Sequence, residues 1–371
     1  MKNIIRIMSV AAIIASQAAG HPAQAAYRFA SFRGRPPIHQ LGGSSSRPLG
    51  LSPDQIKSAY NLPATGGHGT IAIIGAYNDK YIESDLHVFS AQFHLPSCTT
   101  ANGCFEKHLM GPATSNAGWA LETSLDVEWA HAIAPQAKIL LVAATTPSGK
   151  NLLAAIDYAR RRTDVVTISM SWGGAEFPDE VALDNHFQSA NGHITFFASS
   201  GDSGTGAIWP AASPNVVAVG GTKLTFSQGG NVHTESAWTG SGGGVSAYEV
   251  EPAYQIDYTI TKAQGHRALP DVSYNADPSS GYSVYRTAGK SRQGWYVVGG
   301  TSAGAPQWAA IKALGLSADN ARFYTDKATA NSGAFFRDIR SGRNGDCVYY
   351  CQARRHYDYV TGLGSPLTAA F

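Results

Sequence analysis

The segment GGTSAGAPQWAA, residues 299–310, has the residue types of a nucleophile site. Ser302 lies among small residues, after a short apolar run and before an Ala-rich stretch that predicts a helix. A serine hydroxyl attacks a carbonyl carbon efficiently only when a neighbouring base accepts its proton. The rest of the sequence must therefore supply that base.

The segment WALETSLDVEWAHAIAP contains a candidate base. Glu122 and Asp126 lie one above the other on a predicted helix, on a face shared with Trp129. A solvated acidic face would have the same spacing, but large apolar neighbours favour burial. Two buried carboxyls in contact hold a proton between them, and such a pair can accept a serine proton under acid conditions. Glu128 points to a different face, where we expect ordinary surface.

A second acidic candidate lies in ASSGDSG, residues 198–204. Asp202 stands in a glycine-bracketed turn after an apolar run, and hydrogen bonds to the turn backbone alone would explain it. If the turn lies beside Ser302, a protonated Asp202 can donate a hydrogen bond to an oxyanion, whereas an ionised one would repel it. Both acidic candidates then need a retained proton, so activity should fall as the pH rises toward neutral.

Short apolar runs that alternate with helical patterns predict the fold. The alternation favours an α/β, three-layer arrangement in which helices flank a mainly parallel central sheet. The expected strands are residues 70–77, 138–144, 165–172, 194–200 and 215–221, and the clearest further helices are 152–161 and 180–190. Residues 222–285, rich in Gly, Ser and Pro, are expected to form long surface connections.

The N-terminal residues predict export. Two basic residues precede an apolar stretch, and small residues end at Ala25, as in a secretory signal peptide of residues 1–25. We therefore expect a secreted protein, extracellular or periplasmic. Residues 26–50 are rich in Arg, Pro, Ser and Gly and are expected to be a short exposed spacer.

Cysteine spacing predicts two disulfides, and the low charge gives no sign of an anionic partner. In an exported protein, the four cysteines favour two local disulfides, Cys98 with Cys104 and Cys347 with Cys351; zinc is disfavoured because no histidine has finger spacing. Charged residues make up 15% of the chain and the net charge is +2, which gives no reason to expect nucleic acid or a membrane surface as a partner.

Several motifs in order resemble the sedolisins, the serine-carboxyl peptidases related to subtilisin. The resemblance runs from about Leu51 to the C-terminus, through LSPDQIKSAYNLP, ETSLDVEWAHAIAP, SMSWGG, SSGDSG, LPDVSYNADP and GGTSAGAP. It implies that Ser302 is the nucleophile, that Glu122 and Asp126 form the base pair, and that Asp202 serves the oxyanion. It also implies a catalytic domain of residues 51–371. The sequence departs from the family in one respect: sedolisins usually carry a long propeptide, whereas here we expect only the short spacer of residues 26–50.

The resemblance implies a calcium site near the C-terminus as well. Its ligands would come from Asp338, Ile339, Arg354, His356 and Asp358. Carboxylates and main-chain carbonyls are the hard oxygen ligands that calcium prefers. The family usually has glycines at the positions of Arg354 and His356, where main-chain carbonyls would bind the ion.

The expected function is that of a secreted, acid-acting endopeptidase that cleaves polypeptides through an acyl-enzyme on Ser302. We expect the protein to be a monomer. Trp172, Gly173 and Gly174 are expected to form part of the cleft wall. One alternative is a subtilisin-type triad that uses His68. Another is a catalytically silent binding protein on the same scaffold, favoured by the short spacer and by Gly75, where some relatives have a glutamate.

Overall fold

The computed structural model describes residues 29–112, 114–189, 192–227, 232–288, 293–315, 319–325 and 335–367. The predicted signal peptide, residues 1–25, lies outside these ranges. Within them, no helix has both the length and the apolar character needed to cross a membrane.

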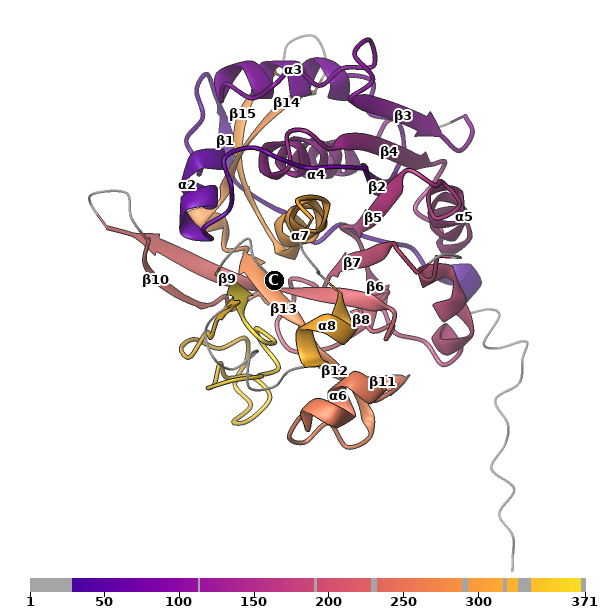
Figure 1. The fold of residues 1–371 in the computed structure, drawn as a ribbon, viewed down its shortest axis with the longest axis vertical. Coiled ribbons are helices and arrows are strands. Elements are labelled where there is room, and N and C mark those ends of the chain that lie inside the picture. Colours follow the sequence, from indigo (N-terminus) through magenta and orange to yellow (C-terminus); the bar gives the residue numbers. More distant parts are fainter. Residues whose placement is uncertain are drawn as a thin grey trace, which may run out of the picture.

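A mainly parallel sheet forms the centre of the molecule (Figure 1), as the sequence predicts. Its order is β10-β9-β7-β5-β2-β4-β3, β13 also pairs with β9, and only the β9–β10 pairing is antiparallel. The strands are β2 (Thr70–Ala76), β3 (Phe105–Leu109), β4 (Lys138–Ala144), β5 (Val165–Met170), β7 (Thr195–Ser199), β9 (Val216–Phe226), β10 (Val232–Ala237) and β13 (Val272–Asn275).

The sheet is buried on both faces because its strands carry apolar side chains on both. In β2, Ile71 and Ile73 belong to one hydrophobic core, whereas Ala72 and Ile74 belong to the other. Successive side chains of a strand point to opposite faces, so a continuous apolar run fills both. Helices α4 (Ala117–Ile133) and α7 (Gly304–Ala313) cover one face and α5 (Gly149–Ala159) covers the other.

A second sheet joins distant parts of the chain above α4. Its order is β1 (His39–Ser45), β15 (Gln293–Gly299) and β14 (Tyr282–Thr287), all antiparallel. β15 leads directly into the nucleophile turn, so this sheet brings the N-terminal residues beside it. The remaining helices are α2 (Pro53–Ala59), α3 (Ile82–Gln92), α6 (Ala253–Tyr258) and α8 (Asn320–Thr325).

Two expected elements differ in the structure. Residues 180–190 were expected to be an α-helix, but Glu180–Phe187 form a 3₁₀ helix, η1, whose N-terminus has no side-chain cap. Residues 222–285 are not surface connections, since they include β10, β13, part of β14, and the antiparallel pair β11 (Gly244–Val250) and β12 (His266–Leu269). The polar residues of this segment predicted surface loops, but many of them are buried and hydrogen-bonded. For example, Asn275 Oδ1 accepts a hydrogen bond from Leu224 N at 3.0 Å.

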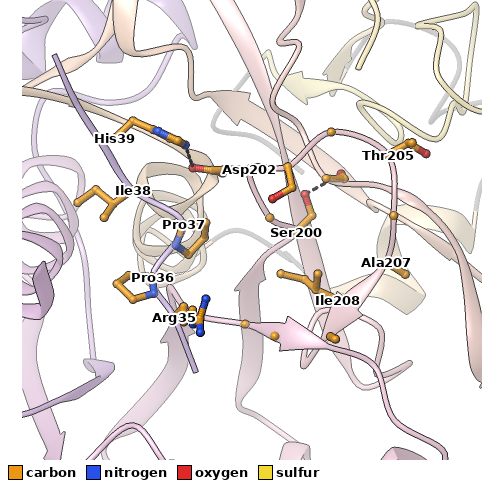
Figure 2. Close-up of a pocket in the computed structure, with 18 residues that line it drawn as sticks. Arg35, Pro36, Pro37, Ile38, His39, Ser200, Asp202, Thr205, Ala207 and Ile208 are labelled. Carbon is orange, nitrogen blue, oxygen red and sulfur yellow. Dashed lines mark hydrogen bonds and ion pairs between the residues drawn. The ribbon is translucent and has the colours of Figure 1, made fainter. Parts of the chain in front are cut away.

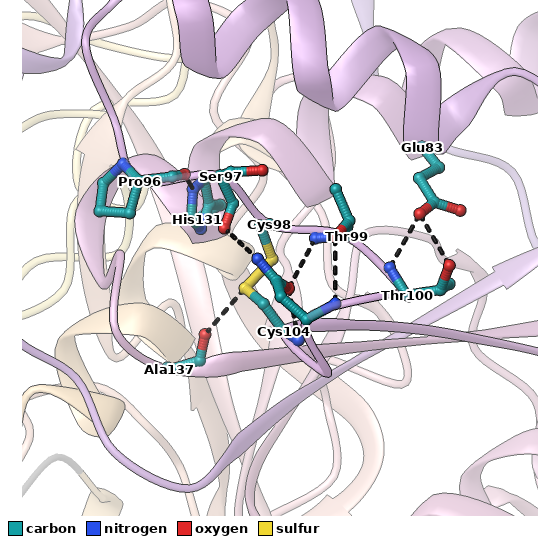
Figure 3. Close-up of a disulfide and its surroundings, with 10 residues drawn as sticks. Glu83, Pro96, Ser97, Cys98, Thr99, Thr100, Cys104, His131 and Ala137 are labelled. Atoms are coloured by element: carbon teal, nitrogen blue, oxygen red, sulfur yellow. Dashed lines mark hydrogen bonds between the residues drawn. A yellow bond between two sulfur atoms is a disulfide. The ribbon is translucent and has the colours of Figure 1, made fainter.

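Both predicted disulfides are present. Cys98–Cys104 closes the loop before β3, where His131 Nε2 lies 2.8 Å from the Pro96 carbonyl oxygen (Figure 3). Cys347–Cys351 closes a loop in the C-terminal region, near the short strands β16 (Phe336–Arg337) and β17 (Ser365–Pro366). Cys98, Cys104 and His131 form a group with metal-binding side chains among the described residues, but the disulfide removes both thiolates.

A buried ion pair ties the C-terminal part of the sheet together. Arg267 in β12 and Asp271 are both fully buried, and Arg267 Nη1 donates to Asp271 Oδ1 at 2.8 Å. Asp271 Oδ2 also accepts from Ala218 N in β9, and Oδ1 from the Tyr324 hydroxyl in α8. The carboxylate thus links three elements.

Removal of Arg267 should destabilise the fold, because the charge of Asp271 would stay buried without its ion-pair partner. Arg267→Met should lower the free energy of unfolding by about 3–5 kcal/mol, measured by denaturant titration. Arg162→Met, which breaks a partly exposed ion-pair cluster with Glu106 and Asp164, should cost about 1 kcal/mol or less. Equal losses would contradict the linking role of Arg267.

Candidate active site

The Ser302 turn is held by glycine and by its neighbours. Gly300 has φ 123°, a region that favours glycine, and Thr301–Ala303 form a 3₁₀ turn, η3, before α7 begins at Gly304. Ser302 is fully buried. A side chain at position 300 would place its Cβ 2.2 Å from the Pro37 carbonyl oxygen and 2.6 Å from Asp202 Oδ2. Only glycine leaves room for both oxygens beside the nucleophile.

Helix α4 presents Glu122 and Asp126 toward this turn. Asn116 caps the helix by accepting from Trp119 N, and α4 packs against α7 and η3. Both carboxyls are 2% exposed. Asp126 Oδ1 accepts a hydrogen bond from Ser171 Oγ at 2.7 Å, and the same hydroxyl lies 3.2 Å from the Ser302 carbonyl oxygen. Ser171, just after β5, therefore links the acid helix to the nucleophile turn.

Burial is the main cause of the carboxyl pKa values in this site. It raises the pKa of Glu122 well above its ordinary value, the neighbouring Asp126 adds to the rise, and the Ser302 hydroxyl lowers it. It raises the pKa of Asp126 too, against the effect of the Ser171 hydrogen bond. The pair therefore retains a proton at a pH where an exposed carboxyl would be ionised.

The contact between Glu122 and Ser302 is close but not a well-formed hydrogen bond. The nearby hydroxyl stabilises the ionised carboxyl, yet Ser302 Oγ and both Glu122 oxygens have no partner of ordinary geometry among the described residues. The effect on the Glu122 pKa requires only that the Ser302 hydroxyl lie near the carboxyl. Such contacts commonly tighten when substrate binds.

Asp202 follows β7 and reaches the same turn. Its Oδ1 accepts from Thr301 N at 2.8 Å and from Thr301 Oγ1 at 2.7 Å, and its side chain is 6% exposed. Its Oδ2 lies 3.1 Å from His39 Nε2. Burial raises the pKa of Asp202, while the contacts with His39 and Thr301 lower it. The turn thus places a carboxyl beside Ser302, as the oxyanion role requires.

A cavity of about 420 Å³ opens beside these residues (Figure 2). One wall is the Ser200–Ile208 segment, and residues 35–39 run along the opposite side. Gly173 and Gly174 also line the cavity. Trp172, also expected in the wall, is fully buried and donates from Nε1 to the Ile74 carbonyl. Trp172 therefore lies in the core next to the cleft and does not line the cavity.

One acidic residue departs from the expectation. Glu128 was expected at the surface, but it is fully buried and its Oε2 accepts from Tyr285 N at 3.0 Å. The sheet of β1, β15 and β14 covers this side of α4, a long-range contact that helical spacing does not reveal.

The residues expected to bind calcium lie together. His356 N donates to Asp338 Oδ1 and Arg354 N donates to Asp358 Oδ2, both at 3.0 Å. His356 has φ 66°, a conformation that favours the glycine usual at this position. Loop 354–358 therefore connects the two carboxylates.

The donor chemistry fits a cation in part. Asp358 is 2% exposed and belongs to no ion pair among the described residues. Burial raises its pKa to about 7, and its oxygens already accept hydrogen bonds from Arg354, Val360 and Thr361. Asp338 is already ion-paired, with Arg340 Nε 2.7 Å from its Oδ2, and buried Ile339 lies between them in sequence. Arg340 would compete with a cation for Asp338. The calcium site stays a prediction.

Comparisons with known proteins agree with the fold and the motifs. The model of the subtilase family of peptidases matches residues 97–332, more than half of the chain. The chain belongs to the subtilase family. A solved structure of Pseudomonas sedolisin, a serine-carboxyl proteinase complexed with pseudo-iodotyrostatin, has a TM-score of 0.73 and 26% identity over 86% of this chain and 96% of its own.

Curated relatives give the same result. Kumamolisin from Bacillus sp. (strain MN-32) is 30% identical over 87% of this chain and 63% of its own length. Sedolisin from Pseudomonas sp. (strain 101) is 28% identical over 85% of this chain and 60% of its own length. The expected similarity to sedolisins is thereby confirmed, and the chain spans less than two thirds of the length of these relatives.

Sequence reasoning missed three residues that contact the candidate site: Ser171, Thr301 and His39. Ser171 lies in the motif SMSWGG and Thr301 in GGTSAGAP. These motifs predicted that both residues are near the site but not which groups they contact. His39 lies in a segment interpreted as a spacer, and no local pattern indicates its contact with Asp202.

Buried carboxyls with raised pKa values predict how stability depends on pH. Burial raises the pKa of Glu249 to about 8 and that of Glu180 to about 9, in addition to the pair on α4. The folded state then binds more protons than the unfolded state above about pH 4, so stability should fall as the pH rises from about 4 to about 9. Melting temperatures across this range should decline.

Single substitutions test whether buried carboxyls cause the decline in melting temperature with rising pH. Asp126→Asn should flatten the dependence, because a neutral amide does not titrate, whereas Asp346→Asn at a 99% exposed side chain should leave it unchanged. A wild-type melting temperature that rises steadily from pH 4 to pH 8 would contradict the assignment.

Proposed function

We propose that this chain is a secreted, acid-acting endopeptidase that hydrolyses polypeptides through an acyl-enzyme on Ser302. The observation that carries the proposal is the convergence of Glu122, Asp126 and Asp202 on one buried serine. Family membership and the similarity to sedolisin support peptidase chemistry. The two disulfides and the signal-like N-terminus support export.

The proposed base is the α4 pair. Glu122, the carboxyl nearer to Ser302, takes the hydroxyl proton as Oγ attacks the peptide carbonyl carbon. Asp126 shares that proton and is itself oriented by Ser171. The proton then passes to the leaving amine, and the reverse sequence with water hydrolyses the ester.

The proposed oxyanion site combines the Ser302 N–H with Asp202. In acid, a protonated Asp202 donates to the oxyanion, and Thr301 holds it in place. Both this role and the shared proton on α4 are lost as the pH rises. Activity at acid pH follows from the same burial that raises the carboxyl pKa values.

The structure disfavours the alternative triad with His68. His68 N donates to the Ala313 carbonyl, at the C-terminal end of α7, whereas Ser302 precedes the N-terminal end. A ten-residue helix is about 15 Å long, so His68 cannot contact the serine hydroxyl.

Kinetics on a peptide library at acid pH test the mechanism. Ser302→Ala should lower kcat/KM by at least about a thousandfold, and Glu122→Gln and Asp126→Asn by about a hundredfold or more. Glu106→Gln, at a half-exposed carboxyl far from the serine, is the matched control and should retain wild-type rates. Inactive wild type at every pH would favour the silent binding protein.

Two substitutions of Asp202 test its proposed role as the oxyanion donor. Asp202→Ala should lose about a hundredfold to a thousandfold in kcat because no donor remains. Asp202→Asn keeps a neutral donor and should retain more activity than Asp202→Ala. Equal rates for the two variants would contradict the oxyanion role.

We also propose that calcium stabilises the C-terminal region, supported by the way loop 354–358 joins the carboxyls of Asp338 and Asp358. A chelator should lower the melting temperature by a few degrees, on the order expected for loss of a bound ligand. Asp338→Ala should remove this dependence, whereas Asp346→Ala should retain it. A melt that does not respond to the chelator would contradict the site.

A further inference from the structure

The loop closed by Cys98–Cys104 lies against the C-terminal end of α4, where His131 is fully buried beside it (Figure 3). The two sulfur atoms and a ring nitrogen of His131 all lie within 4.8 Å of one another. Among the described residues, this is the only group of three His, Cys, Asp or Glu side chains with potential metal ligands so close together. Spacing along the chain does not reveal the group, because the packing of α4 brings the imidazole to the cysteines.

One nitrogen of the His131 ring has a partner and the other has none. Nε2 lies 2.8 Å from the Pro96 carbonyl oxygen, and a carbonyl only accepts, so Nε2 carries the hydrogen. Nδ1 is buried and has no hydrogen-bond partner among the described residues. Burial lowers the pKa of His131, which favours the neutral ring with a lone pair on Nδ1. An imidazole that binds a metal through one nitrogen usually donates from the other to a carbonyl or a carboxylate, as His131 does.

Hydrogen bonds hold the loop in place independently of its disulfide. Asn102 Oδ1 accepts from Cys104 N at 3.0 Å, and the Cys104 carbonyl accepts from Ile139 N in β4 at 2.8 Å. Glu83 Oε1, on α3, accepts from both the N–H and the hydroxyl of Thr100, each at 2.8 Å. None of these contacts needs the sulfur–sulfur bond, so the loop should keep both sulfurs beside the helix when that bond is opened.

Solvent reaches the loop at its tip and at one of the two cysteines. Residues 100–103 are exposed and Cys104 is partly exposed, whereas Cys98 is only 1% exposed. A small thiol reductant can therefore attack at Cys104. Two molecules of such a thiol give two electrons and two protons to the disulfide, which becomes two thiols, and the two molecules leave joined by a disulfide of their own.

The three side chains have the chemistry of a zinc site. Thiolate and imidazole are the ligands that zinc prefers, whereas calcium takes oxygen ligands. Two thiolates at about 2.3 Å from a tetrahedral zinc ion lie about 3.8 Å apart. The Cα atoms of Cys98 and Cys104 are 4.8 Å apart, so rotation of the two side chains can supply that spacing. Two thiolates also cancel the charge of a divalent ion, which lowers the cost of burying it.

We propose that reduction of the Cys98–Cys104 disulfide opens a binding site for a divalent cation of the zinc class, held by Cys98, Cys104 and His131. On binding, each thiol releases one proton to solvent, and the two thiolates and the neutral imidazole bond to the ion. A water takes the fourth tetrahedral position. The loop then has two alternative closures, a covalent one under oxidising conditions and a metal-bound one under reducing conditions. This inference does not depend on the proposed peptidase function.

Cobalt binding tests the site, because Co²⁺ in a tetrahedral site with thiolate ligands absorbs visible light. The full chain carrying Cys347→Ser and Cys351→Ser keeps only the cysteine pair of interest, and a phosphine reductant opens it in the absence of oxygen. This reduced chain should bind one Co²⁺, which Zn²⁺ displaces, whereas the oxidised chain should show no such absorption. His131→Gln should weaken Co²⁺ binding by at least about tenfold, and Cys98→Ser should do so as well.

The matched control is His87→Gln, the same change at an exposed histidine of α3, which should bind Co²⁺ like the parent chain. Reduced wild type provides a second measurement, since it should give the same absorption and lose it in Cys98→Ser. Zn²⁺ should also raise the melting temperature of the reduced chain by a few degrees.

Three results would overturn the metal site. The first is a reduced wild type without thiolate–Co²⁺ absorption, and the second is His131→Gln with the affinity of the parent chain. The third is loss of the folded structure on reduction, measured by circular dichroism, because the hydrogen bonds of the loop would then not hold the cysteines beside His131.

Discussion

The burial of two carboxyls without a cation beside them is the constraint on which the active site depends. Ionisation of Glu122 and Asp126 together would place two negative charges in a region that water does not reach. A retained proton removes that cost, and in the proposed mechanism it lets the pair exchange protons with Ser302. Apolar packing of α4 against α7 maintains this environment, so the core and the chemistry of the site have one physical origin.

The fold brings the site together at the carboxyl ends of central strands, as is usual for open α/β sheets. Ser171 follows β5 and Asp202 follows β7, while Ser302, the proposed nucleophile, comes from the turn after β15 in the second sheet. Hydrogen bonds join these turns: Asp202 accepts from Thr301, and Ser171 Oγ donates to the Ser302 carbonyl oxygen. Thr301 and Ser171 therefore orient the proposed catalytic groups through hydrogen bonds, and neither is itself proposed as the nucleophile or the base.

Local pattern was enough to predict much of this arrangement. The apolar strands and α4 follow from periodicity, because each buries side chains at regular spacing. Contacts between distant segments were not predictable in that way: Glu128 is covered by β14, and residues 222–285 bury polar groups that look like loop residues in sequence. The expectation of an exposed spacer was wrong for residues 32–39, which form an extended segment paired with residues 147–149 on one side and with Gly173 on the other. The sequence RPPIH has no apolar period, and its structure depends on these two distant segments.

The attachment of that segment to β1 has a consequence for its binding strength. A peptide joined covalently to its own cleft faces a high effective concentration, typically millimolar for a short flexible connection, so even a weak sequence can fill the site. Another peptide reaches the same part of the cleft only at a bulk concentration that rivals this value. The covalent connection, more than the sequence of residues 32–37, therefore keeps the cleft filled.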